Sequence, residues 1–526
     1  MSRVILIAWD GADWRILDPL LGQGALPNLQ ALLDRGQRDV LRSTIPTHSW
    51  SAWPSFLTGV DPVDHGVYDI LETAPGTHKQ YPVTFKSIKT RTFLEDLTAA
   101  GKRVLMLDVP LTFPPPKISG TLIAGGVLPK HRAFTAPDDL TADLVKARLE
   151  WPINGMSWTT YRNKPDAYLD EAYEITQKRI KVSEHLMDNT EWDLMASVWV
   201  SIDRTQHALS NYVAPDHPDY LENKDTRIGR KTADIFRQVD EALGSFVSRA
   251  RPDDLILFIS DHGFQSCTRT VNMDRLLKEF GYLDFSASSH VFGPMQWGPM
   301  RKVARKVYDT LGLHGKVALP QSVNWSKTKA YTTIRSTGEG VSVNLAGREL
   351  GGIVDPGDYD RVRDELLDRL GSFVDAKTGK TPVKEIYKRE EMFKGRFADT
   401  APDILMVPNE GYSLTHAKTA LEDADWVSGD HRIEGCIVAV GPDVKPFEAP
   451  PALIDMAPTL VAALGAPTAV EPTGRVLQEL LGADAHLVSR EASSGGIPGM
   501  DANDSAVTDT EADEMEEHLR GLGYIE

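Results

Sequence analysis

Three short apolar runs, each followed within two residues by an aspartate, constrain the fold of this chain most strongly. Residues 4–9, 192–201 and 254–260 are rich in aliphatic and aromatic side chains. Such continuous runs are typical of strands buried on both faces of a parallel sheet. Amphipathic helical segments at residues 166–187 and 227–247 separate them. This alternation predicts an α/β fold with a doubly wound, mostly parallel sheet flanked by helices.

Two stretches depart from this rhythm and are expected to be inserted cap regions. Residues 129–188 are predicted to form a cap over the site, and residues 266–399 a second insertion or small domain with a helix at 301–311. The core is then expected to comprise residues 1–128, 189–265 and 400–485, with residues 402–407 returning to it. The polar candidates of the second insertion, which either bind substrate or buttress it, are Asn344, Arg348, Tyr387 and Arg389.

The segment 486–526 is rich in Ser, Gly and acidic residues. This composition predicts a flexible acidic tail with one short helix at residues 511–520. The helix could be a docking tail, but a solvated end is the preferred expectation.

Charge limits the partners of this chain. It has 526 residues and a formal net charge of −18, which argues against nucleic-acid or anionic-membrane binding. An anionic small substrate would therefore need local positive charge, for example from metal ions. Only two cysteines are present, Cys267 and Cys436, and the sequence has neither a signal-like start nor a membrane-length apolar stretch. We expect a cytoplasmic protein, and assembly with copies of itself stays open.

Aspartates and histidines recur where the predicted strands end, which is where open α/β sheets bind their ligands. This pool consists of Asp10 or Asp13, Asp203, His207, Asp261, His262 and His431. Asp203 and His207 are four residues apart, so they share one face if a helix begins there. Each pair alone is equally typical of a turn, a helix cap or a solvated helix face. Their recurrence at successive strand ends predicts one shared site.

Mixed nitrogen and oxygen ligands of this kind suit two divalent metal ions. Zn²⁺ is the first choice, with Mn²⁺ or Mg²⁺ as alternatives. Two ions about 3.5–4 Å apart can hold both the attacking and the leaving oxygen of an in-line displacement. The pool therefore predicts a two-metal site suited to an in-line displacement.

The hydroxyl-rich stretch 43–69 is predicted to be a nucleophile loop. Its hydroxyl residues include Ser43, Thr44, Thr47, Ser49, Ser51 and Ser55, interleaved with Trp50, Trp53 and Phe56. The stretch continues to Thr58-Gly59, where the glycine permits a tight turn. A hydroxyl is a poor nucleophile until a base or a metal ion lowers its pKa. The metal ions expected above would supply that activation.

The motifs taken together resemble a known family. They are WDGADW, SWSAWPSFLTG, SIDRTQH, SDHGF, GDHRIEG and DMAPTL, which span nearly the whole chain. This set is similar to the alkaline phosphatase superfamily, and within it to the type I phosphodiesterase/nucleotide pyrophosphatase-like phosphohydrolases. The resemblance implies an alkaline phosphatase-like core.

The resemblance also implies roles for individual residues. It assigns Asp203, His207 and His431 to one metal ion, and Asp10, Asp261 and His262 to the other. It places the nucleophile nine residues before Thr58, on Ser49, which also bridges toward a metal ion. Ala52 departs from the nucleotide pyrophosphatase pattern, which has an asparagine there. The sequence around Ser49 lacks the C/S-x-P-x-R context of sulfatases, which disfavours sulfatase activity.

These roles predict a hydrolase that cleaves phosphodiester or pyrophosphate bonds of a small phosphorylated molecule through a phosphoserine at Ser49. Trp53 is expected to line an apolar wall for the second ester group. A phosphomonoesterase or phosphomutase is the alternative, and it would need extra cationic contacts from Lys130, Arg132 and Arg204. A catalytically silent binding protein is the second alternative, disfavoured because the ligand set is complete.

Overall fold

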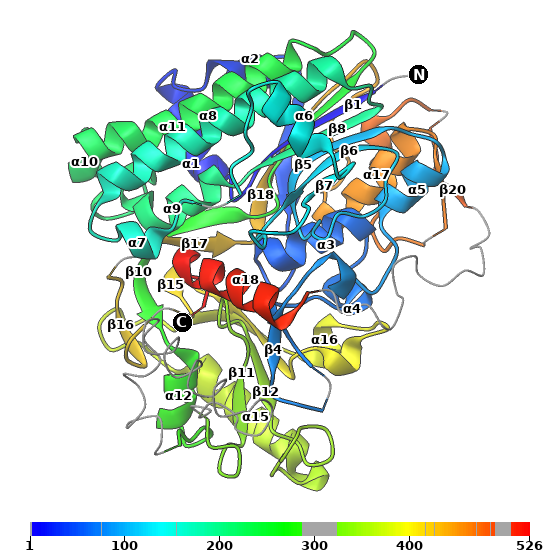
Figure 1. The fold of residues 1–526 in the computed structure, drawn as a ribbon. Coiled ribbons are helices and arrows are strands. Elements are labelled where there is room, and N and C mark those ends of the chain that lie inside the picture. Colours follow the sequence, from blue (N-terminus) through cyan, green and yellow to red (C-terminus); the bar gives the residue numbers. More distant parts are fainter. Residues whose placement is uncertain are drawn as a thin grey trace, which may run out of the picture.

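The central sheet of the computed structural model sets the layout of the molecule (Figure 1). The structure describes residues 3–525 except 75, 154, 287–322, 416, 426, 470, 484 and 490–506, so the helix expected at 301–311 lies outside the described residues. The eight strands are, in spatial order, β2 (Gln37–Arg42), β18 (Glu434–Val440), β9 (Leu255–Ile259), β1 (Val4–Trp9), β8 (Leu194–Trp199), β5 (Val104–Pro110), β6 (Gly120–Gly125) and β7 (Thr135–Ala136).

The middle of this sheet is parallel, which confirms the predicted fold class. Strands β9, β1, β8, β5 and β6 all pair in parallel, whereas β18 runs antiparallel to both β9 and β2. Successive side chains of a strand point to opposite faces. Along β1, Leu6 packs into the core on one face and Ile7 into the core on the other. Both faces are apolar, so helices must cover both.

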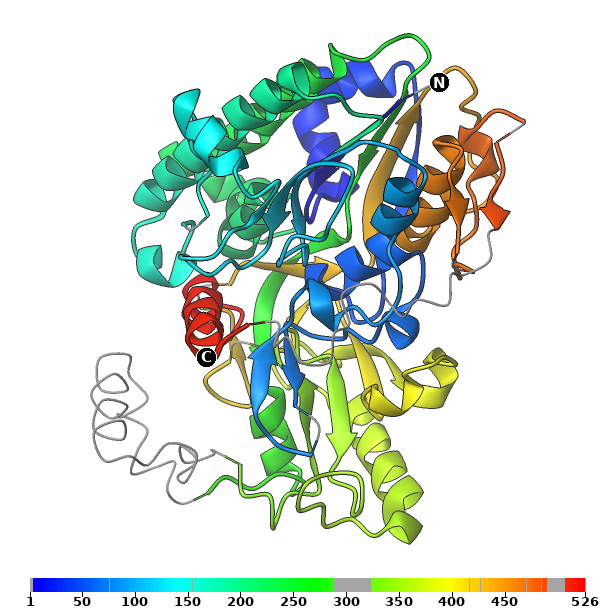
Figure 2. The same ribbon diagram turned by 45° about the vertical axis from the view of Figure 1, so that its right-hand side comes forward.

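Two layers of helices provide that cover (Figures 1 and 2). One face carries α1 (Trp14–Gly22), α2 (Pro27–Leu33), α8 (Pro165–Asn189), α9 (Ser201–Val213) and α11 (Arg227–Val247). The other face carries α3 (Ser49–Thr58), α5 (Phe93–Ala99) and α17 (Met456–Ala463). The helices expected at 166–187 and 227–247 are thereby confirmed.

The expected nucleophile loop is partly helical. Helix α3 begins at Ser49 and is buried along its whole length, with Trp53 and Phe56 in edge-to-face contact 5.3 Å apart. Gly59 ends the helix in the left-handed region at φ 73°, which confirms the expected turn. The hydroxyls and Pro54 made this segment look irregular, but burial of its aromatic side chains outweighs their weak helix propensity.

A smaller antiparallel sheet lies below the core in Figure 1, with order β11 (Ala330–Ile334), β12 (Gly340–Val343), β14 (Ile404–Pro408) and β13 (Val383–Lys388). Helices α12 (Met273–Glu279) and α15 (Tyr359–Ser372) pack on it. Residues 402–407 therefore do not return to the central sheet as expected. Their apolar run pairs with β12 and β13 instead, because such a run suits any buried strand.

Long strand β10 (Gly263–Val271) connects the two parts. It pairs with β15 (Gly411–Ser413), β16 (Leu421–Asp423) and β17 (Gly429–Arg432). In the β10–β17 pair, Phe264 lies opposite His431. The segment after β9 and the segment before β18 are therefore held side by side.

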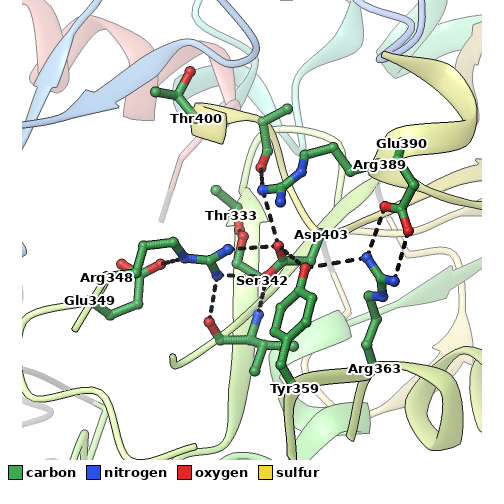
Figure 3. Close-up of polar contacts among 12 residues, drawn as sticks. Thr333, Ser342, Arg348, Glu349, Tyr359, Arg363, Arg389, Glu390, Thr400 and Asp403 are labelled. Carbon is green, nitrogen blue, oxygen red and sulfur yellow. Dashed lines mark hydrogen bonds and ion pairs between the residues drawn. The ribbon is translucent and has the colours of Figure 1, made fainter. Parts of the chain in front are cut away.

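Buried Asp403 organises a polar network in the smaller sheet (Figure 3). Both guanidinium nitrogens of Arg348 donate to it, at 2.7 and 2.6 Å, and the Tyr359 hydroxyl donates at 2.7 Å. Arg389 pairs with the same carboxylate at 3.2 Å. Of the two expected roles, Arg348 and Arg389 serve the structural one.

The two other polar candidates of the second insertion also make structural contacts. The buried Asn344 amide donates to the carbonyls of Trp325 and Thr328. The Tyr387 hydroxyl donates to Glu385 on the same strand. All four candidates of this insertion thus buttress it.

The acidic tail helix is docked, and the preferred expectation of a solvated end is wrong. Helix α18 (Asp509–Leu522) lies across the core beside α7 (Trp158–Tyr161) and β4 (Gln80–Pro82), seen in red in Figures 1 and 2. Its Ala512, Met515 and Leu519 are buried, and Met515 and Leu519 belong to the same apolar core as α3. This spacing gives the helix a buried stripe. Among the described residues, no helix is long and apolar enough to cross a membrane.

Candidate active site

The topology of the central sheet brings the predicted site residues to one edge. Strands β9, β1 and β8 are parallel neighbours, so Asp261, Asp10 and Asp203 follow them at the same edge. Because β18 runs the other way, the segment just before it lies at this edge too, and that segment carries His431. Residues far apart in sequence therefore meet here.

One group forms around Asp203. The Nε2 atoms of His207 and His431 lie 3.4 and 3.3 Å from Asp203 Oδ1 and 2.9 Å from each other. Asp203 and His207 share one face of α9, as their spacing predicted. The three side chains converge on a single point.

A second group forms around His262. Its Nε2 atom lies 3.4 Å from Asp261 Oδ2 and 3.7 Å from Asp10 Oδ1. The Ser49 hydroxyl, at the start of α3, donates to Asp10 Oδ1 at 3.1 Å and lies 3.2 Å from His262 Nε2. The two groups adjoin, because the rings of His262 and His431 are only 4.0 Å apart.

The histidine rings are oriented as metal ligands would be. The Nδ1 atoms of His207, His262 and His431 lie at 3.3, 3.0 and 3.0 Å from the backbone carbonyls of Gly429, Gly263 and Thr47. A carbonyl only accepts, so each Nδ1 carries a proton, and each Nε2 faces the centre, where it would offer its lone pair to a bound metal ion. Such outer bonds typically fix the tautomer of ligating histidines.

Two buried carboxylate oxygens also indicate a metal site. Asp203 Oδ1 and Asp261 Oδ2 have no hydrogen-bond partner among the described residues. The Nε2 atoms of His207 and His431 lie 2.9 Å apart beside these oxygens, so a proton or a metal ion is needed between them. The donor set therefore fits divalent metal ions, as the sequence predicted.

Burial and mutual repulsion shape the electrostatics. Burial, followed by the charges of Asp261 and Asp203, raises the pKa of Asp10 well above its usual value. Burial and the charge of Asp203 raise the pKa of Asp261 to about 8, and burial lowers that of His262 to about 4. Burial acts on Asp203 in the same direction, but the charges and hydrogen bonds of His207 and His431 outweigh it and hold that pKa well below the usual range. A cation would relieve this repulsion between carboxylates.

Comparison with known families decides the affiliation. The sequence profile described as type I phosphodiesterase / nucleotide pyrophosphatase matches residues 4–433. The chain belongs to this family. It is accordingly a hydrolase that acts on phosphoric ester bonds. No curated protein sequence matches the chain.

Solved structures share the fold of this family member. Phosphonoacetate hydrolase from Sinorhizobium meliloti 1021, in complex with phosphonoformate, is similar over 88% of this chain and 95% of its own, with 17% identity and a TM-score of 0.54. An inactive form of murine ectonucleotide pyrophosphatase/phosphodiesterase 5 in complex with AMP is similar over 92% of this chain and 100% of its own, with 17% identity and a TM-score of 0.52. Both confirm the alkaline phosphatase-like architecture.

The sequence left Asp10 and Asp13 as alternatives in this phosphodiesterase-family chain, and the structure separates them. Asp10 belongs to the site, whereas Asp13 caps α1 by accepting from the Arg15 amide at 2.7 Å. Its other oxygen accepts from Phe264 N at 3.1 Å and pairs with Arg432 at 3.0 Å. Asp13 therefore ties three of the family motifs together without entering the site.

Gly11 supports the site through its backbone. Its amide donates to Asp261 Oδ1 at 3.2 Å, and its carbonyl accepts from Gln206 at 2.7 Å. It has φ +69°, and a Cβ there would lie 3.0 Å from Phe264 and 3.3 Å from Asp203 Oδ1. Only glycine fits this position without strain.

Trp53 is not a substrate wall, contrary to expectation. It is fully buried, and its indole N–H donates to Asp10 Oδ2 at 3.1 Å. Trp53 therefore holds Asp10, a predicted metal ligand, in place through its Oδ2 atom.

The three cations expected to contact substrate have other neighbours. The amide of Lys130 donates to Glu514 at 3.0 Å, and Arg132 pairs with Glu511 at 3.4 Å, so both segments contact α18. Arg204 acts with Arg179 on Asp108, opposing the rise in pKa that burial causes there. Arg204 follows Asp203 directly and is the nearest of the three to the site in sequence and in fold.

Sequence reasoning missed two residues of the site. Asp430 forms a possible ligand group with His207 and His431, and its place in the GDH motif was a usable signal. Tyr524 donates its hydroxyl to Asp203 Oδ2 at 3.0 Å. Nothing in the local sequence around Tyr524 indicates this contact, because it depends on where α18 docks.

A cavity of about 1000 Å³ adjoins the site at Tyr524. It lies between the tail helix and the smaller sheet, and its cationic lining includes Arg275 and Arg335. This volume is at the upper end of small-molecule sites.

Proposed function

We propose that this protein is a metal-dependent hydrolase of phosphodiester or pyrophosphate bonds that works through a phosphoserine at Ser49. One observation carries the proposal. The Ser49 hydroxyl lies within 3.2 Å of both Asp10 and His262, beside a second group built on Asp203. The proposed nucleophile, the groups proposed to activate it and the proposed ligand set thus lie together at one buried edge.

The ligand groups are proposed to hold two divalent ions, with Zn²⁺ preferred and Mn²⁺ or Mg²⁺ as alternatives. Asp203, His207 and His431 would hold one ion, and Asp10, Asp261 and His262 the other. When bound, these ions supply positive charge that favours the Ser49 alkoxide and stabilises charge developing on the leaving oxygen.

The chain's own residues carry the displacement. Ser49 Oγ forms the bond to phosphorus as the bond to the leaving oxygen breaks, and water later hydrolyses the phosphoserine. Asp10 Oδ1 already accepts the Ser49 hydroxyl proton in a hydrogen bond. The N-terminus of α3, where Ser49 stands, favours negative charge on the transferring group.

The cavity beside Tyr524 favours a substrate with a second group on the phosphorus. It provides room for an ester or phosphate substituent, and Arg275 and Arg335 suit an anionic one. By contrast, the segment with Lys130 and Arg132, which a monoesterase would need near the ions, is occupied by α18. The diester or pyrophosphate class is therefore preferred. Two free, buried cysteines support a reducing, cytoplasmic location as part of the proposal.

The test combines metal content with hydrolysis of a bis-aryl phosphate diester and of the matching aryl monoester. We expect about two ions per chain and faster diester turnover. Ser49→Ala should abolish turnover and keep its ions. Near wild-type activity in Ser49→Ala would refute the phosphoserine pathway, and faster monoester turnover would refute the substrate class.

A further inference from the structure

The tail brings a side chain into the candidate site from outside the region that defines the family. The family profile ends at residue 433, whereas Tyr524 lies just beyond α18. Its hydroxyl donates to Asp203 Oδ2 at 3.0 Å, and its ring meets the ring of His207 edge-on, at 89° and 6.0 Å.

The two oxygens of Asp203 have different partners. Oδ1 faces the Nε2 atoms of His207 and His431 and has no hydrogen-bond partner among the described residues. Oδ2 faces away from them and is held by Tyr524. A carboxylate anchored through one oxygen presents the other in a fixed direction. We propose that Tyr524 is a positioning residue that orients Asp203 for metal binding, an inference that rests on the proposed function.

The tail is built to hold Tyr524 in this place. Gly523 turns the chain in the left-handed region at φ 89°, and Tyr524 N donates to Leu519 O at 3.1 Å. The carbonyl of Gly521 accepts from the hydroxyls of Ser157 and Thr159, both at 2.9 Å. The phenol is thus pre-positioned by Ser157 and Thr159 at α7 and by the buried stripe of α18.

This arrangement matches the outer hydrogen bonds of metal sites in general. Carboxylates that bind a metal are typically hydrogen-bonded by a second residue, and loss of that residue costs about 10- to 100-fold in metal affinity or activity. The bond is partly buried and is made to the buried carboxylate of Asp203, and hydrogen bonds to a carboxylate are among the stronger ones.

The experiment compares Tyr524→Phe with Tyr359→Phe in the full chain. Tyr359 also donates to a buried aspartate, Asp403, at 2.7 Å, but in the smaller sheet (Figure 3). Zn²⁺ affinity is measured by competition with a chelating indicator, and Co²⁺ substitution reports the coordination spectrum. We expect Tyr524→Phe to weaken the binding of one of the two metal ions about 10- to 100-fold and to alter the Co²⁺ spectrum of that site. Tyr359→Phe should bind both ions as wild type does.

A second variant guards against a folding defect. The double change Ser157→Ala and Thr159→Ala removes both hydrogen bonds to Gly521 O and loosens the tail without changing Tyr524. It should weaken the binding of the same ion, but by less than Tyr524→Phe does. Unchanged Zn²⁺ affinity and spectrum in both variants, with normal metal binding and turnover in wild type, would overturn this inference alone. A wild-type protein that binds no divalent ion would overturn the proposed function as well.

Discussion

Trp53→Phe tests whether the indole behind Asp10 positions this carboxylate for catalysis. The change keeps an aromatic ring in a fully buried position and removes one N–H that donates to Asp10 Oδ2 at 3.1 Å. Asp10 Oδ1 accepts from Ser49, so a carboxylate free to rotate loses its alignment with the nucleophile. The prediction therefore concerns rate more than folding.

The magnitude follows from the kind of bond. A hydrogen bond to a charged group contributes about 1.5–3 kcal/mol, which corresponds to roughly 10- to 150-fold in kcat/KM. Replacing Trp by Phe also leaves a small cavity, and we expect this to cost about 1–2 kcal/mol of unfolding free energy, less than the 3–5 kcal/mol of a truncation to alanine.

Trp192→Phe is the matched control. Trp192 is also buried, and its N–H donates to Met187 O at 3.3 Å before the start of β8, away from the site edge. Both variants are assayed by kcat/KM on a bis-aryl phosphate and by denaturant unfolding. We expect similar losses of stability and a loss of kcat/KM in Trp53→Phe alone. The reasoning is refuted if Trp53→Phe keeps kcat/KM within about twofold of the control, a change too small for a lost charged hydrogen bond.

Three further predictions concern the ions, the loop after β1 and the tail. Removing the metal with a chelator should lower the melting temperature, because a ligand at 100 times its Kd adds about 2.7 kcal/mol to the stability of the folded state. An unchanged melting temperature in a calorimetric scan would contradict metal binding by the proposed ligand groups. Gly11→Ala should cost about 1–2 kcal/mol of unfolding free energy through backbone strain. It should also weaken metal binding, because the new Cβ would lie 3.3 Å from Asp203 Oδ1. Chelator competition measures the metal affinity, and an affinity equal to that of the wild type would contradict the prediction. Leu519 is 1% exposed, so Leu519→Ala should lower the free energy of local unfolding of α18 by about 2–5 kcal/mol. Hydrogen exchange should become faster in α18 while β1 stays protected. Equal protection of α18 in the variant and the wild type would argue against docking.

Strand positions and the site edge were accessible from sequence because local pattern determines them. The apolar runs at β1, β8 and β9 could be recognised as doubly buried strands, and parallel pairing then forces the residues after them to one edge. His431 required more, since its approach depends on β18 running antiparallel. The recurrence of Asp and His residues placed His431 in the predicted site, and the motif resemblance assigned it to the same ion as Asp203 and His207.

The misassigned elements share a dependence on tertiary contacts. The run at 402–407 has the composition of a central strand, and only its pairing with β12 and β13 assigns it to the smaller sheet. Trp53 looked like a binding-site aromatic, because sequence does not reveal which side of Asp10 it occupies. The docking of α18 depends on a core surface assembled from distant segments. Propensity carries no information on such contacts.

The position of β18 between β2 and β9 also affects how the protein is made. Among the described residues, β2 pairs within the central sheet with β18 alone, so residues 37–42 cannot pair there until residues 434–439 have left the ribosome. Until then the nascent chain exposes an unpaired strand edge and lacks His431. Such late, distant pairing slows folding and leaves intermediates prone to aggregate. The strand pairing that completes the candidate site therefore also leaves the chain exposed to aggregation during synthesis.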